Sequence, residues 1–222
     1  MGNRRESSNF NKTANIMLVI GLLLLAIPSG LWLYAHYYQL SEAKKWESTI
    51  KAGSTQTGKK HDNATKTAKN DPKKTDLTSL ADRGVYSPGQ DIAFLIIPKL
   101  NLRLSVIEGE TWANLAKGPI HVSKTAKLGN NGTVLISGHR TMYSAPFHNL
   151  HELAPADKIT IYTKRAVFTY EVAQIKQVMP DDWRDVTAKG EPRLILSTCD
   201  PIYSAARRLL IISRLIQASP LK

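Results

Sequence analysis

An uninterrupted apolar stretch near the N-terminus limits what this chain can fold into more than any other feature. Residues 16–33, IMLVIGLLLLAIPSGLWL, contain no charged side chain. In a helix with a rise of about 1.5 Å per residue, these residues extend about 27 Å, close to the thickness of the hydrocarbon core of a bilayer. The stretch has no polar face, which argues against an amphipathic helix at the edge of a soluble core. We predict a transmembrane anchor over residues 16–38.

The residues that flank the apolar stretch predict its orientation. Residues 1–15 contain three basic side chains, which favour a cytoplasmic N-terminus. Aromatic residues follow the stretch, as expected at the far membrane interface: Trp32, Tyr34, Tyr37 and Tyr38. A cleaved signal peptide is the alternative, but no A-x-A pattern follows and the apolar run continues beyond Gly30. We therefore expect a single-pass protein of the cell membrane whose C-terminal part is extracellular.

Composition separates a linker from a folded domain. Residues 39–83 are rich in Lys, Thr, Ser and Asn and lack apolar periodicity, so we predict a flexible basic linker whose first part extends the helix to about Thr49. The net charge of the chain is +12, but residues 84–222 carry only about +6 and contain no block of Lys and Arg. This distribution argues against a nucleic-acid partner and favours a basic surface that faces solvent or the membrane.

Residues 84–222 read mainly as short strands separated by turns. One short helix is expected over TWANLAKG, with Thr111 as its N-cap, and another turn or two of helix between Pro146 and Leu153. The pattern predicts a closed or nearly closed β-barrel of about eight strands. The expected strands are Ile92–Ile97, Leu102–Gly109, Thr133–Ser137, Lys158–Thr163, Ala166–Val172, Ile175–Met179, Leu194–Thr198 and Leu209–Leu215.

The single cysteine of the chain, Cys199, follows directly after an apolar strand. A buried cysteine can be no more than a small apolar side chain, whereas a cysteine at a strand end can be a nucleophile. A lone cysteine in an exported protein has no partner for an intramolecular disulfide, which favours a reactive thiol or an intermolecular bridge. Cys199 is therefore a candidate nucleophile.

Two further strands carry side chains that complete such a site. His139 follows the strand TVLIS, and Arg207 and Arg208 precede the last strand. An imidazolium next to a cysteine favours the thiolate and can protonate a departing amine, and an arginine can bind a developing oxyanion. Adjacent strand residues face opposite sides, so only one arginine can reach the site, and we expect this to be Arg208.

The segments ISGHRTMYSAPFHNL, LSTCDP and RRLLII resemble the three active-site segments of the sortases, transpeptidases of the bacterial cell surface. The likeness extends over about residues 91–216 and includes the anchor and linker. The family's T-L-x-T-C signature falls on residues 195–199, where Ile195 replaces the first Thr. The G-H-R-T-x-Y-x-A-P-F stretch is most similar to class E sortases, although Asp200 stands where that class commonly has His.

The resemblance implies an activity. Sortases cleave a C-terminal L-P-x-T-G-like or L-A-x-T-G-like sorting signal between Thr and Gly, hold a thioester on the cysteine, and transfer the acyl group to an amine. It implies Cys199, His139 and Arg208 as catalytic residues, surface proteins and a peptidoglycan precursor as partners, and no cofactor. The alternatives are a pilus-polymerising sortase, an L,D-type wall transpeptidase, whose S-x-G-C segment is absent, and a non-catalytic surface protein.

Other candidate residues are expected to bind substrate or no ligand at all. Met142, Tyr143 and Thr198 are candidates for lining a substrate groove, with ordinary loop packing as the alternative for the first two. The other histidines of the barrel, His121, His148 and His151, are interpreted as surface residues rather than metal ligands. Some sortases bind calcium through acidic residues before the histidine strand; here that segment holds lysines and no carboxylate, so we expect no metal.

Overall fold

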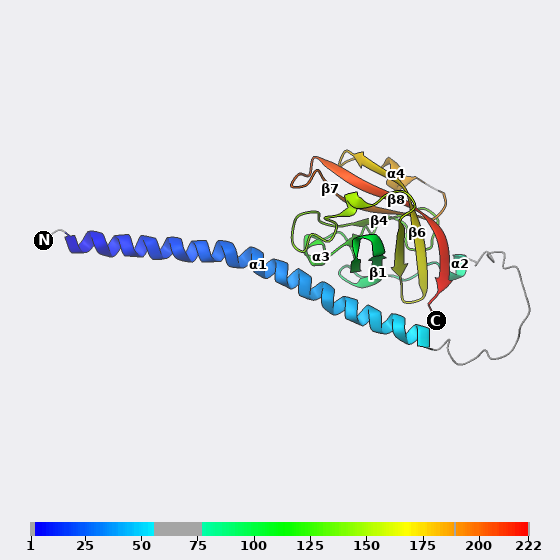
Figure 1. The fold of residues 1–222 in the computed structure, drawn as a ribbon, viewed down its shortest axis with the longest axis horizontal. Helices are drawn as coiled ribbons and strands as arrows, with labels where there is room; N and C mark the ends of the chain where they lie inside the picture. The colour runs from blue at the N-terminus through cyan, green and yellow to red at the C-terminus, as the bar shows by residue number, and fades with distance from the viewer. Residues whose placement is uncertain (1–2, 56–76, 189, 222) are drawn as a thin grey trace, which may run out of the picture.

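The computed structural model describes residues 3–55, 77–188 and 190–221, and it contains a β-barrel next to one long N-terminal helix (Figure 1). The strands close in the order β1-β2-β3-β4-β7-β8-β6-β5. Their bounds are β1 Asp91–Ile97, β2 Leu102–Glu108, β3 Ile120–His121, β4 Thr133–Ser137, β5 Lys158–Tyr162, β6 Ala166–Val178, β7 Arg193–Asp200 and β8 Arg207–Pro220. The predicted eight-stranded closed barrel is confirmed.

Several strands differ from the prediction, and β8 extends from Arg207 to Pro220 where a strand over residues 209–215 was expected. The two strands expected over residues 166–172 and 175–179 form one strand, β6, in which the pairing with β8 shifts between Val172 and Gln174. The sequence analysis missed β3, because a strand of two residues has too few side chains to show a pattern. Nevertheless β3 is essential to the barrel, since it pairs in parallel with β2 and antiparallel with β4.

The central strands β4 and β7 are apolar on both faces because both faces are covered. Leu194 and Leu196 of β7 point into the barrel, whereas Ile195 belongs to a second apolar cluster on the outside. Val178 and Val186 pack on this outer cluster. This double burial explains the continuous apolar runs of these strands. Further buried residues of the inner core include Leu95, Ile97, Val134, Ile136, Phe168, Tyr170 and Ile211.

Short helices connect the strands. The predicted helix is present as α3, Trp112–Lys117, and the Thr111 side chain accepts a hydrogen bond from the Asn114 amide at 3.2 Å, so this N-cap is confirmed. Residues 150–152 form one 3-10 turn within the segment where a helical turn was expected. The remaining short elements, which the sequence analysis did not predict, are α2 Leu77–Leu80, a 3-10 turn Pro98–Leu100 and α4 Arg184–Thr187.

The N-terminal helix α1, Asn3–Thr55, is longer than predicted and lies against the barrel (Figure 1). Its segment Lys12–Ala52 is long and apolar enough to include a membrane span. The helix extends into the expected linker, as predicted, but it continues to Thr55 rather than ending near Thr49, and Gln39 and Trp46 are buried against the barrel. Trp46 stacks on Phe94 of β1 with ring centroids 6.2 Å apart. Residues 56–76 of the expected linker lie outside the described residues.

Gln39 fixes α1 to β2 at Ser105, beyond the two β2 residues that pair with β3. Its side-chain oxygen accepts a hydrogen bond from the Ser105 amide at 2.9 Å, and its side-chain nitrogen donates to the carbonyls of Lys117 at 3.0 Å and Ser105 at 3.3 Å. The close fit depends on Gly118, where an added Cβ would lie 2.0 Å from the Gln39 nitrogen. The Tyr38 hydroxyl donates to Asp91 at 2.7 Å in the same interface. The sequence did not predict these contacts, because polar side chains make them and polar side chains are normally expected to be solvated.

Candidate active site

Strand register brings the histidine and cysteine segments side by side at one end of the barrel. Strands β4 and β7 run parallel, with Ser137 opposite Ser197. Just beyond this pair, the Gly138 amide donates to the Ser197 carbonyl at 3.0 Å, and the Thr198 hydroxyl donates to the Gly138 carbonyl at 2.8 Å. His139 and Cys199 each stand two residues after the paired serines. His139 and Cys199 therefore occupy equivalent positions on neighbouring segments.

The third element, β8, lies on the other side of β7. Cys199 pairs with Arg208 and Asp200 with Arg207 in antiparallel register. Directly opposed residues of an antiparallel pair share one face, so Arg208 lies on the Cys199 face and Arg207 on the other. Arg208 is partly buried, and its guanidinium donates to the Ala205 and Arg207 carbonyls, both at 3.1 Å. The structure therefore brings Cys199, His139 and Arg208 onto three consecutive strand ends.

His139 is enclosed by aromatic rings. The centroids of the Trp112 and Tyr143 rings lie 5.7 Å and 5.3 Å from that of the imidazole, with Trp112 in an edge-to-face arrangement. Burial lowers the pKa of His139 below its ordinary value, because an imidazolium loses hydration in this setting. The His139 Nε2 atom is buried and has no hydrogen-bond partner among the described residues.

Replacing Trp112 with Ala should raise the pKa of His139 toward the ordinary value of about 6.5. Removing the indole admits water to the imidazole and reduces the cost of charging it. The measurement is an NMR titration of the His139 ring in the wild-type and Trp112→Ala proteins. A wild-type midpoint at or above the ordinary value, or no upward shift in the variant, would contradict the role of burial by Trp112.

A buried ion pair that the sequence analysis missed joins the histidine and cysteine segments. The Arg140 guanidinium donates to the Asp200 carboxylate and, at 3.1 Å, to the Cys199 carbonyl. Both side chains are buried, and a buried pair of opposite charges stabilises only when its geometry and further hydrogen bonds offset the loss of hydration. Asp200 thus contributes a partner for Arg140, which directly follows His139. The sequence does contain a hint of this pair, because residues of opposite charge directly follow the two candidates: Arg140 after His139 and Asp200 after Cys199.

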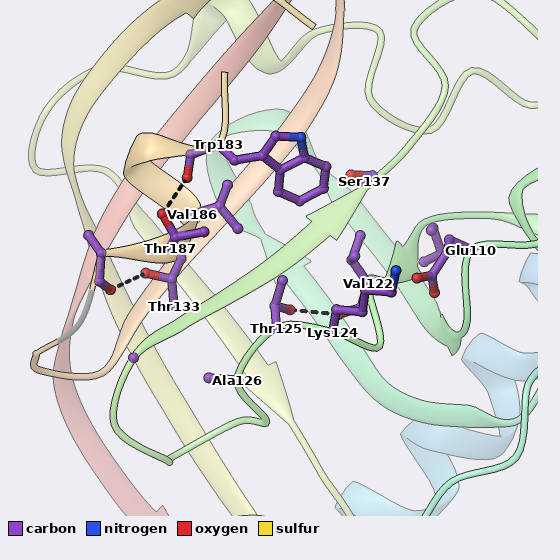
Figure 2. Close-up of a pocket in the computed structure, with 13 residues that line it drawn as sticks. Glu110, Val122, Lys124, Thr125, Ala126, Thr133, Ser137, Trp183, Val186 and Thr187 are labelled. Atoms are coloured by element: carbon purple, nitrogen blue, oxygen red, sulfur yellow. Dashed lines mark hydrogen bonds between the residues drawn. The ribbon is translucent and has the colours of Figure 1, made fainter. Parts of the chain in front are cut away.

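Two adjoining cavities lie on the outer face of β4 and β7; Arg208 lines one of them, whereas Cys199 and His139 line neither. One cavity contacts Arg208, Ser197, Ser137, Trp183 and Val186 among others. It shares the last three with a larger cavity of about 870 Å³ between the segment 122–126, β4 and the α4 segment. Figure 2 shows this larger cavity, with the Trp183 indole extending over β4 toward Ser137. The larger cavity is lined mainly by apolar surface.

The three residues expected to bind substrate occupy different environments. Thr198 is buried, and its hydroxyl holds β7 to Gly138 from the face opposite to Cys199. Tyr143 contacts the rings of His139 and Trp112. Met142 is exposed, and together with Tyr143 it lines a separate cavity against α1. The sequence could not distinguish these environments, because they depend on contacts with distant segments such as α1 and α3.

The prediction that His121 is a surface residue is wrong. His121 is buried, and its Nδ1 lies 2.7 Å from the Glu108 carboxylate, while its Nε2 lies 3.1 Å from the Ala126 carbonyl. The short strand β3, absent from the prediction, places His121 opposite Glu108 of β2. The other two, His148 and His151, are exposed as expected. Within the described part of the chain, no group of three or more His, Cys, Asp or Glu side chains is arranged to hold a metal ion.

Comparison with known proteins identifies the barrel. A family model described as a sortase domain matches residues 95–216, more than half of the chain. Sortase D of Bacillus subtilis (strain 168) is 29% identical over 202 residues, which cover 88% of this chain and 97% of the relative. Sortase SrtE1 of Streptomyces coelicolor (strain ATCC BAA-471 / A3(2) / M145) is 30% identical over 156 residues, 62% of this chain and 44% of that protein. These matches set aside the L,D-type wall transpeptidase and the non-catalytic surface protein.

A solved structure supports the same assignment. The sortase E of Streptomyces avermitilis superposes with a TM-score of 0.55 and 28% sequence identity, covering 61% of this chain and 93% of that chain. The barrel therefore has the sortase fold and is similar to class E, as the GHR segment predicts. On the family model and these relatives together, the chain belongs to the sortase family and is a cysteine transpeptidase that acts on surface proteins.

Proposed function

We propose that the protein is a membrane-anchored sortase that cleaves an LPxTG-like or LAxTG-like sorting signal between Thr and Gly. The acyl group is held as a thioester on Cys199 and transferred to an amine of a cell-wall precursor. The observation that carries this proposal is the strand register, in which Cys199 lies between Arg208 of β8 and the segment that follows β4 and contains His139.

Cleavage begins with the Cys199 thiolate. Its sulfur attacks the carbonyl carbon of the Thr–Gly bond, and Arg208 donates hydrogen bonds to the negative charge that develops on the carbonyl oxygen. The carbon–nitrogen bond breaks, the glycine amine leaves with a proton from His139, and a thioester remains on Cys199. An acceptor amine then attacks the thioester and loses a proton to His139. The amide forms and the thiolate is restored.

The larger, mainly apolar cavity supports recognition of the signal residues before the scissile bond. Its walls combine β4, the segment 122–126 and the α4 segment, with Trp183 over the strand (Figure 2). A peptide whose carbonyl meets Cys199 can continue along Ser197 and Ser137 toward this apolar space. Large apolar side chains such as the Leu of the signal suit such a surface.

The N-terminal helix supports a membrane location. The chain includes one helix that satisfies the length and hydropathy of a span, close to its N-terminus, within the described residues. We propose a single pass with a cytoplasmic N-terminus and an extracellular barrel, on the basis of the basic residues that precede the apolar stretch.

The test is a transpeptidation assay with the full-length protein in lipid vesicles. Peptides that contain LPxTG, LAxTG or a scrambled motif are incubated with glycine-based amines or a lysine-containing pilin-like peptide, and products are read by mass spectrometry. We expect cleavage after Thr and ligation to the glycine-type amine for one of the two motifs. Cleavage elsewhere, or none of either motif, overturns the proposed specificity. Ligation to the lysine peptide alone would indicate a pilus-polymerising sortase.

A further inference from the structure

We propose that the active-site end of the barrel rests on the outer surface of the lipid bilayer, with Met142 and its loop in the membrane interface. The partner is the lipid surface itself. This inference depends on the membrane anchor of the proposed function, and it adds an orientation that an anchor alone does not give. An anchor followed by a flexible linker would leave the barrel free to rotate and to move away from the bilayer.

The first argument is that α1 and the barrel form one packed unit. Gln39 makes three hydrogen bonds to Ser105 and Lys117, and Tyr38 bonds to Asp91. The stacked Trp46 continues the contact one to two turns further along the helix. Glu47 closes it with an ion pair to Arg103 at 2.9 Å. These contacts extend along α1 from Tyr38 to Glu47, so the orientation of the helix determines the orientation of the barrel.

The second argument is the height of the active-site loop along the helix. A cavity of about 770 Å³ lies between α1 and the loop that follows His139. Its walls are the helix residues Pro28, Ser29, Leu31 and Trp32 and the loop residues Thr141, Met142 and Tyr143. The four helix residues belong to the last turns of the apolar stretch that ends at residue 33. If that stretch spans the bilayer, the loop is level with the outer boundary of the hydrocarbon.

The third argument is the chemistry of the side chains at this end. Met142 is 46% exposed, and Trp112 of α3 is 62% exposed. The β7–β8 loop, at the end of the barrel from which the N-terminal half of α1 extends, carries Tyr203 at 87% exposure (Figure 1). Aromatic side chains and apolar loop residues are typical of protein surfaces at the headgroup region of a bilayer. Water is a poor environment for these three side chains, and a lipid interface suits them.

The experiment compares two positions on opposite ends of the barrel. In the Cys199→Ala background, Met142→Cys or Lys164→Cys supplies the single cysteine for an environment-sensitive NBD label. Lys164 is exposed in the β5–β6 hairpin. The carbonyl of the next residue, Arg165, accepts a hydrogen bond from the Leu221 amide near the C-terminus, so this hairpin lies away from the proposed contact. The full-length proteins are placed in vesicles of phosphatidylcholine and phosphatidylglycerol, with and without a doxyl-labelled lipid. We expect blue-shifted emission and several-fold stronger quenching for the label at Met142.

The controls separate the orientation from the anchor. Flotation of the same vesicles tests anchoring: protein that does not float removes the anchor and the inference together. If the protein floats but the two labels are quenched equally, or neither is quenched, the anchor stands and the orientation is wrong. Gln39→Ala, which removes the hydrogen bonds to β2, should retain flotation and reduce the difference between the labels. An unchanged difference in this variant would show that the helix contact does not hold the barrel in place.

Discussion

Replacing Cys199 with Ala should abolish both cleavage and amine ligation while the barrel stays folded. The expected loss is complete, because no other thiol exists in the chain to carry the acyl group. Cys199 is only partly buried, so the substitution should change the free energy of unfolding by no more than about 1 kcal/mol. The measurements are product formation by mass spectrometry and a thermal unfolding curve of each protein.

Two controls sharpen this prediction. Cys199→Ser keeps the size of the side chain but replaces the thiolate with a weak nucleophile, so it should be as inactive as the alanine variant. A thioester adduct at Cys199 should be detectable in the wild-type protein by intact mass when no amine is supplied. Peptide cleavage by a folded Cys199→Ala protein would overturn the mechanism, even if His139 and Arg208 also proved necessary for activity.

Arg208→Ala should lower kcat/KM by about 10²–10³, the typical effect of losing one oxyanion donor. Arg207→Ala is the matched control, because it removes the same side chain from the adjacent position on the opposite face. Register with β7 puts Arg208 opposite Cys199 and Arg207 opposite Asp200. Arg208 also lines the smaller cavity, whereas Arg207 is exposed. The Arg207 variant should therefore stay within a few-fold of the wild type.

Lysine at position 208 should not restore activity, because a point charge lacks the planar set of donors of a guanidinium. All variants are measured with one sorting peptide and one amine at saturating acceptor. If Arg207→Ala strongly lowers kcat/KM and Arg208→Ala does not, Arg207 rather than Arg208 is the arginine of β8 that contacts the substrate. Full activity of both variants would remove arginine from the mechanism.

The sequence was sufficient for the barrel and for naming the candidate residues of the site. Apolar strands bounded by turns predict their own positions, and β4 agrees with its expected bounds, residues 133–137. Cys199, His139 and Arg208 became candidates because each lies within two residues of the end of an expected strand. Their proximity could not be derived from the residues alone, since it depends on which strands pair. The parallel β4–β7 contact and the antiparallel β7–β8 contact supply that information.

Polar contacts between distant segments were beyond the reach of the sequence. Gln39 is separated from Ser105 by 66 residues, and Arg140 from Asp200 by 60 residues. A glutamine in a polar stretch and a charged residue in a loop are normally solvated, so composition favours exposure for both. Burial becomes favourable only because the folded chain offers several hydrogen-bond partners at once.

The contact of Gln39 with β2 also changes what a shortened form of this protein would be. At Ser105 the helix side chain takes both the amide and the carbonyl of the strand, in the manner of a neighbouring strand. A chain that begins after the helix would leave these groups open and would uncover Phe94, on which Trp46 stacks. Open strand edges next to apolar surface pair readily with other molecules. We expect the helix to shield this strand edge and the Phe94 ring, so a fragment without it should associate with itself more readily than the full-length chain.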